Sequence, residues 1–184
     1  MKTITIIGKN NVDEITKLMD DSFEPTRNGV DKFDYDFMSH KNQFDSLCRI
    51  FIDGQKPSIN GNKSTNNIPH IVSELNRKIR GYKAQDLRNG CYNDKVFIDI
   101  NLIIEKLISC RLTCVHCKCN VLVLYKNVRD PVQWTLDRIN NSLGHNVGNI
   151  QISCFKCNVQ RGTKSFIKFN DTKHQKINKI LIAE

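Results

Sequence analysis

The sequence lacks any run of about 18 consecutive apolar residues, the length that a membrane-spanning helix needs. Its N-terminal segment, Met1–Lys9, has an apolar run too short for a secretory signal. No segment of the chain repeats another. We therefore expect a protein with no membrane contact that is not secreted and stays intracellular, in the cytoplasm, the nucleus or a virus-infected cell.

Apolar residues make up only 39% of the 184 residues. A chain of this length forms either one domain with a sizeable core or two small domains. Between residues 55 and 69 the composition shifts to Gly, Asn, Ser, Lys and Pro, with little to bury. We therefore expect an N-terminal region at 1–54 for recognition, dimerisation or docking, a linker or long loop at 55–69, and a basic domain at 70–184.

The charge is spread unevenly along the chain. Residues 1–72 carry 9 Lys and Arg against 10 Asp and Glu, whereas residues 73–184 carry 19 against 9. A basic half of this kind is typical of proteins that bind a phosphate backbone, although a solvated basic surface gives the same count. The charge alone therefore favours neither interpretation.

Hydrophobic periodicity and turn residues predict a mixed α+β fold. After the linker an apolar stripe from Ile71 to Tyr82 predicts a helix, and Asp99 is the expected N-cap of a helix ending at Ser109. The other predicted elements are a strand at 3–8, helices at 12–19 and 41–53, strands at 121–125, 133–137 and 149–153, and helices at 155–163 and 171–183.

Two Cys-x-x-Cys pairs, Cys114 with Cys117 and Cys154 with Cys157, have the spacing of a structural zinc site. In a reducing compartment such pairs indicate metal binding and not disulfides. Four thiolates close a tetrahedron and replace a core that a module of ~50 residues cannot build alone. Cys110 and Cys119 lie close enough to compete, and Cys119 could replace Cys117. We expect His116, inside the first pair, to be a solvent-facing spacer.

Around these pairs the chain reads Leu136-Asp-Arg-Ile-Asn, then Gly144-His-Asn-Val-Gly-Asn-Ile, then Cys154-Phe-Lys-Cys-Asn. This pattern resembles the HNH nucleases, the ββα-metal or His-Me finger group, in their zinc-stapled form, from Cys114 to Lys164. The resemblance implies a ββα-metal nuclease core stapled by four cysteines and flanked by helices, with a small α+β N-terminal region.

Residue by residue, the resemblance implies that Asp137 and Asn158 hold a catalytic Mg²⁺ or Mn²⁺ and that Asn149 supports the loop. A carboxylate and an amide oxygen form a hard, incomplete site with room for water and phosphate oxygens. The chain departs from the family at Arg138, where the family has the histidine that activates water. Metal binding therefore carries over from the family, and the identity of the general base does not.

Arg138 stays protonated, so it can clamp the scissile phosphate but cannot accept a proton. His145 is the only imidazole within the three quoted stretches and suits the task near neutral pH, although a loop-packing role fits it equally well. The other candidates for proton acceptor are groups around Tyr82, Gln85 and Asp86, or water activated by the metal alone.

The function that we predict is metal-dependent hydrolysis of DNA phosphodiesters by an HNH-type endonuclease. The family resemblance implies 5′-phosphate and 3′-hydroxyl ends. One such site cuts one strand, so double-strand cleavage calls for a homodimer or successive nicks. The alternatives are a catalytically inactive zinc-stapled DNA-binding module and a protein-binding zinc ribbon. The residues expected to contact DNA are Arg77, Lys78, Arg80, Lys83, Arg161 and Lys164.

Overall fold

The computed structural model describes residue 27 and residues 39–53 and 68–174. The described part is a mixed α+β fold with five helices and one two-stranded sheet, which confirms the predicted class. The predicted strand at 3–8, the helix at 12–19 and the end of the helix at 171–183 lie outside the described residues. No helix in the described ranges is both long and apolar enough to cross a membrane.

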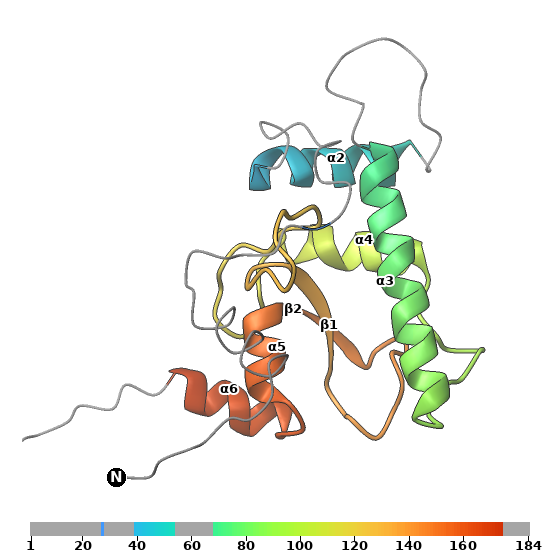
Figure 1. Ribbon diagram of the computed structural model, residues 1–184, viewed down its shortest axis with the longest axis vertical. Coiled ribbons are helices and arrows are strands. Elements are labelled where there is room, and N and C mark those ends of the chain that lie inside the picture. Colours follow the sequence, from blue (N-terminus) through green and yellow to red (C-terminus); the bar gives the residue numbers. More distant parts are fainter. Residues whose placement is uncertain (1–26, 28–38, 54–67, 175–184) are drawn as a thin grey trace, which may run out of the picture.

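Three helices form one side of the fold: α2 (His40–Ile52), α3 (Ile68–Arg88) and α4 (Ile100–Ser109). Figure 1 shows them gathered above and beside the sheet. Asp99 caps α4 as predicted, since its Oδ1 accepts a hydrogen bond from Leu102 N at 2.8 Å, an interaction worth about 1 kcal/mol. Helix α3 begins at Ile68, so the last two residues of the predicted linker at 55–69 belong to the helix. Pro69 is tolerated there because first-turn amides need no helical partner.

The helices share one buried core with the sheet. Leu47 and Ile50 from α2 belong to the same apolar cluster as residues from α3, α4 and both strands. The other large members of this cluster are Ile71, Leu75, Ile98, Ile103, Ile104, Leu107, Leu112, Leu124, Trp134, Leu136, Ile150, Ile152 and Phe169. The described part of the N-terminal region is therefore packed on the basic half.

The sheet is an antiparallel hairpin, β1 (Trp134–Arg138) and β2 (Ile150–Cys154), with Asp137 paired opposite Gln151. Helix α5 (Phe155–Arg161) follows β2 directly, and the Cys154 sulfur caps it by accepting from Cys157 N. The helix ends two residues before the predicted 163, because Gly162 has a positive φ of 53°. The element order in this part of the chain is therefore strand, strand, helix.

Two other predicted elements differ. Helix α6 spans Phe166–His174, so it begins five residues before the predicted start at 171. Phe169, in the part of α6 that precedes the predicted start, is buried. The strand predicted at 121–125 is wrong, since Leu122 forms only an isolated bridge with Gln133.

The buried side chain of Gln43 explains the missing strand. Its Oε1 accepts from Val123 N at 2.8 Å and from Leu124 N at 2.9 Å, and its Nε2 donates to Leu124 O at 3.0 Å. Successive amides of a strand point in opposite directions, so two of them cannot share one acceptor in a regular ladder. The glutamine therefore satisfies this buried segment in place of a neighbouring strand.

Candidate functional site

The four predicted cysteines gather at one point. The sulfur atoms of Cys114, Cys117, Cys154 and Cys157 all lie within 4.8 Å of one another, and three of these residues are buried. The turn that carries the first cysteine pair, residues 114–117, is called the first knuckle below. It is hydrogen-bonded to the sheet because Val115 N donates to Ile152 O at 2.9 Å. This cluster can hold a structural metal such as zinc, with four ligands and no open position.

Among the described residues, neither competing thiol belongs to the group of four mutually close sulfurs. Cys119 nevertheless adjoins the cluster, because its thiol interacts with those of Cys117 and Cys154. A hydrogen bond from the Cys114 thiol to the Cys154 sulfur, together with burial, raises the pKa of Cys114 to about 12, and burial raises the pKa of Cys157 to about 11. Without a cation these thiols hold their protons at neutral pH, so metal binding must release protons.

His116 is not the solvent-facing spacer that we expected. Its side chain is 0% exposed, and its Nε2 lies 2.7 Å from Oδ2 of Asp137. Its Nδ1 lies 3.3 Å from Oδ1 of Asn170, and its ring contacts Phe166 and Phe169 from α6. The knuckle turns the imidazole inward because helix α6 covers it with an apolar face.

Asp137 is held from two sides. Its Oδ2 is hydrogen-bonded to His116, and its Oδ1 accepts from Nη1 of Arg161 on α5. Both Asp137 and Arg161 are almost completely buried. A buried carboxylate with two such donors is fixed in direction, and its charge is compensated by the guanidinium.

A polar cavity of about 170 Å³ opens beside this carboxylate. The cavity brings together four of the five predicted catalytic residues, and the C-terminal end of β1, the loop after it and α5 each contribute to it. Helix α3 contributes a further wall through Tyr82 and Gln85. The residues that line the whole cavity are Tyr82, Gln85, Leu136, Asp137, Arg138, Asn141, His145, Asn158 and Gly162.

Asn149, the fifth predicted residue, does not line that cavity. Its Nδ2 donates to Asn140 O at 3.0 Å and to Gly144 O at 2.9 Å, while its Oδ1 accepts from Asn140 N at 2.9 Å. These three bonds close the 140–149 loop between the two strands. Asn149 therefore shapes the loop that carries His145.

His145 is buried against α3. Its Nδ1 lies 2.8 Å from Oδ1 of Asp86, and its ring centroid lies 4.4 Å from that of Tyr82. Burial lowers the pKa of His145, while the nearby Asp86 carboxylate opposes that shift. The imidazole is therefore neutral at pH 7, the form that can accept a proton.

Arg138 lies over the same loop. Its Nη1 donates to Leu143 O at 3.2 Å and stands 4.0 Å from Oδ1 of Asp86. The guanidinium still lines the cavity. It is therefore held in place by the loop and by α3 with a cationic face toward the cavity.

Two of the six residues expected to contact DNA, Lys78 and Arg161, are buried in the structure. Arg161 is paired with Asp137, as described above. The ammonium of Lys78 donates to Trp134 O and lies 4.8 Å from the Trp134 ring, and burial lowers its pKa to about 7. Position 78 falls on the same helical stripe as Ile71, Leu75 and Tyr82, a signal that the sequence contained.

The other four basic residues reach the surface. Arg77 is exposed but bonded to Glu74 and to the hydroxyl of Tyr125. Arg80 and Lys164 are exposed, and Lys83 is exposed beside the Tyr92 ring at 4.9 Å. The cationic surface is therefore smaller than the sequence indicated.

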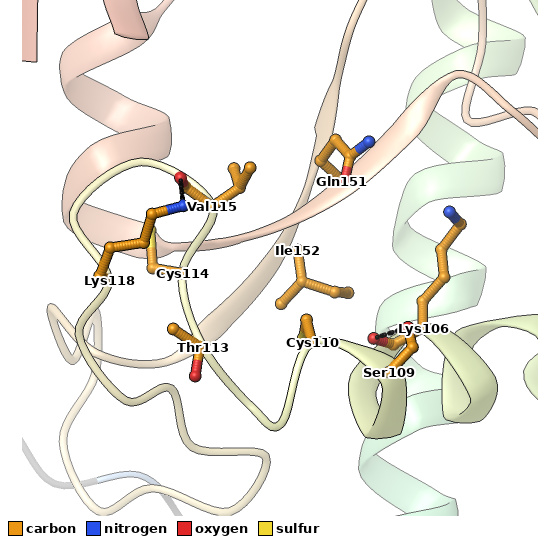
Figure 2. Close-up of a pocket in the computed structure, with 9 residues that line it drawn as sticks. All are labelled: Lys106, Ser109, Cys110, Thr113, Cys114, Val115, Lys118, Gln151 and Ile152. Carbon is orange, nitrogen blue, oxygen red and sulfur yellow. Dashed lines mark hydrogen bonds between the residues drawn. The ribbon is translucent and has the colours of Figure 1, made fainter.

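A second cavity, about 260 Å³ in volume, lies behind the first knuckle. Figure 2 shows Cys110 and Ile152 at its centre, with Lys106 and Lys118 on opposite sides. Of the residues singled out from the sequence it contains Cys114 and its neighbour Cys110. Although larger, it has neither the carboxylate nor the imidazole that the smaller cavity contains.

The sequence named Asp86 only as an alternative proton acceptor and His116 only as a spacer, and it did not predict their pairing with His145 and Asp137. Asp86 lies 59 residues before His145, and His116 lies 21 residues before Asp137, with no spacing rule that links either pair. Comparison of the chain with protein-family models, with curated proteins and with solved structures found no match.

Proposed function

We propose that this protein is a metal-dependent DNA endonuclease that hydrolyses phosphodiester bonds through an HNH-type ββα-metal site. The observation that carries the proposal is the shared cavity of Asp137, Arg138, His145 and Asn158, beside a cluster of four cysteines. A carboxylate, an amide, a cation and a neutral imidazole around one small polar cavity suit phosphoryl chemistry.

The donor set fits a divalent cation. Each Asp137 oxygen accepts one hydrogen bond from the protein and keeps a second lone pair, and Asn158 adds an amide oxygen to the same cavity. These are the hard ligands of Mg²⁺ or Mn²⁺. A bound ion would stabilise the charge that develops on the leaving 3′ oxygen.

The chain's own residues supply the remaining chemistry. Neutral His145 takes the proton of the attacking water, because its pKa lies below the ordinary value and the residue lines the cavity. Arg138 holds a phosphate oxygen and offsets transition-state charge. Asn149 keeps the loop, and hence His145, at the required distance.

DNA is the substrate that the charge favours. The exposed Arg80, Lys83 and Lys164 lie on α3 and after α5, the two helices that contribute walls to the cavity. Cations in these positions hold a phosphate backbone across the cavity mouth. Cleavage of both strands would use a homodimer or two successive nicks.

One observation favours a second candidate, a catalytically inactive zinc-stapled DNA-binding module. Both oxygens of Asp137 are already engaged, and Arg161 places a positive charge where a metal would bind. A carboxylate whose charge is neutralised in this way has less affinity for a second cation.

Incubation with supercoiled plasmid, linear duplex and a four-way junction, in Mg²⁺, Mn²⁺ or EDTA, separates the two candidates. The nuclease converts supercoiled plasmid to nicked circles with either cation and not in EDTA. Protein that retards DNA in a gel but leaves the plasmid intact with both cations supports the inactive module. The three substrates also distinguish a general nuclease from one that requires a junction.

A further inference from the structure

Asp86, near the end of α3, makes two hydrogen bonds to His145 in the 140–149 loop. Its Oδ1 lies 2.8 Å from Nδ1 of His145, and its Oδ2 accepts from the backbone N of the same residue at 2.6 Å. Asp86 is completely buried. One carboxylate therefore binds both the main chain and the ring of a single histidine.

The approach of the loop to α3 is close enough to require glycine before that histidine. A Cβ at Gly144 would stand 2.5 Å from the carbonyl oxygen of Cys91 and 2.7 Å from Oδ2 of Asp86. No real side chain tolerates both contacts. The Gly-His dipeptide of the motif is thus fitted to the end of α3.

The chemistry of this contact decides where the ring proton lies. A carboxylate that already accepts the His145 amide presents lone pairs, so the shared proton belongs to Nδ1. Neutral imidazole with a proton on Nδ1 carries its free lone pair on Nε2. Because Tyr82 packs against the ring, the imidazole is also held in one orientation.

We propose that Asp86 is the positioning residue of the site: it fixes the tautomer and direction of His145 so that Nε2 is the atom that accepts the proton of the attacking water. The inference rests on the proposed nuclease function for its chemical meaning. It adds α3, which lies outside the HNH-like segment, to the working part of the site.

The remaining neighbours of His145 agree with this role. The charged and titratable groups that face it are Asp86 and Tyr82 from α3 and Arg138 and Asp137 from β1. Tyr82 accepts a hydrogen bond from Leu136 N, and burial raises its pKa, so it stays neutral. Asp86 itself is enclosed with both oxygens engaged, so it orients the base and does not replace it.

The test combines nitrogen NMR of His145 with cleavage kinetics. In the wild-type protein the ¹⁵N shifts of His145 should show a protonated Nδ1 and an unprotonated Nε2. In Asp86→Asn that preference should be lost, kcat should fall by ~10²-fold or more with little change in KM, and the acidic limb of the pH profile should move to lower pH. Asp45→Asn, which breaks an exposed pair on α2, is the matched control and should change neither measurement.

The wild-type spectrum decides the inference even if the variant does not fold. A proton on Nε2 of wild-type His145, or an Asp86→Asn enzyme with unchanged tautomer and rate, would overturn it. Failure of the proposed function gives a different result: wild-type protein that cuts no DNA while Nδ1 carries the proton removes the nuclease and leaves the control of the tautomer by Asp86 supported.

Discussion

The Nε2 atom of His116 lies 2.7 Å from Oδ2 of Asp137, so the first cysteine knuckle is hydrogen-bonded directly to the carboxylate of the nuclease-like motif. The side chain of His116 therefore connects the four-cysteine cluster with the polar cavity. Anything that displaces the knuckle also releases one of the two groups that hold Asp137.

Replacing His116 with Phe should keep the ring contacts with α6 but remove the bond to Asp137. A buried carboxylate oxygen then lacks a donor, which should lower the free energy of unfolding by about 1–3 kcal/mol. Zinc content should not change. Chemical denaturation with elemental analysis measures both quantities. Lys118→Met, an exposed change in the same knuckle, is the control, and equal stability of the two variants would show that the bond to Asp137 contributes nothing.

The four-cysteine cluster should bind one zinc ion per chain. Cys154→Ser should lose the metal and melt the hairpin and α5, because binding energy at such a site is folding energy and because this sulfur also caps the helix. Circular dichroism before and after chelation provides the measurement. Cys48→Ser, on α2 and outside the cluster, should keep its zinc. Purified wild-type protein with well under one zinc would contradict the assignment.

DNA affinity should depend on the exposed cations and not on the buried one. The double variant Arg80→Ala with Lys83→Ala should flatten the dependence of log K on log salt by about 2, because each lost phosphate contact removes nearly one released counterion. Lys78→Met should leave that slope unchanged, because its side chain faces Trp134. Fluorescence anisotropy across a salt series measures the slopes, and equal slopes in both variants would place the DNA elsewhere.

Lys78 should make stability depend on pH. Its pKa is about 7 in the fold, against ~10.4 for an unfolded chain, so between these values the unfolded chain binds more protons. The free energy of unfolding should therefore rise as the pH increases from about 7 to about 10. Urea denaturation across that range should show the rise in wild type and a flatter profile in Lys78→Met. Exposed Lys83→Met should behave as wild type; if Lys78→Met does too, the rise has another source.

Asn158 offers a cleaner test of the catalytic cation than Asp137. Asn158→Ala should lower the cleavage rate by ~10²-fold or more at unchanged melting temperature, because within the described structure its side chain lines the cavity and bonds nothing else. Asp137→Ala should also lower stability by about 3–5 kcal/mol, because Arg161 is left buried without its partner. Equal cleavage by wild type and Asn158→Ala would remove Asn158 from the metal site.

Local patterns predicted most of the scaffold. The hairpin, the Asp99 cap and the cysteine cluster follow from spacings of a few residues or from chemistry that admits few partners. What the sequence could not predict depends on distant contacts. The inward turn of His116 requires α6, and the irregular 121–125 segment requires Gln43, which lies 80 residues before Val123. Local periodicity contains no information about either partner.

The bonds from Gln43 also set a limit on how the chain can be divided. A fragment cut at the predicted boundary of 70 would keep every residue of the cavity but lose α2. Three main-chain groups at Val123 and Leu124 would then lose their hydrogen-bond partner, and the core would lose Leu47 and Ile50. The smallest fragment of the described chain that keeps the cavity's support therefore begins before Ser39, whose side chain caps α2.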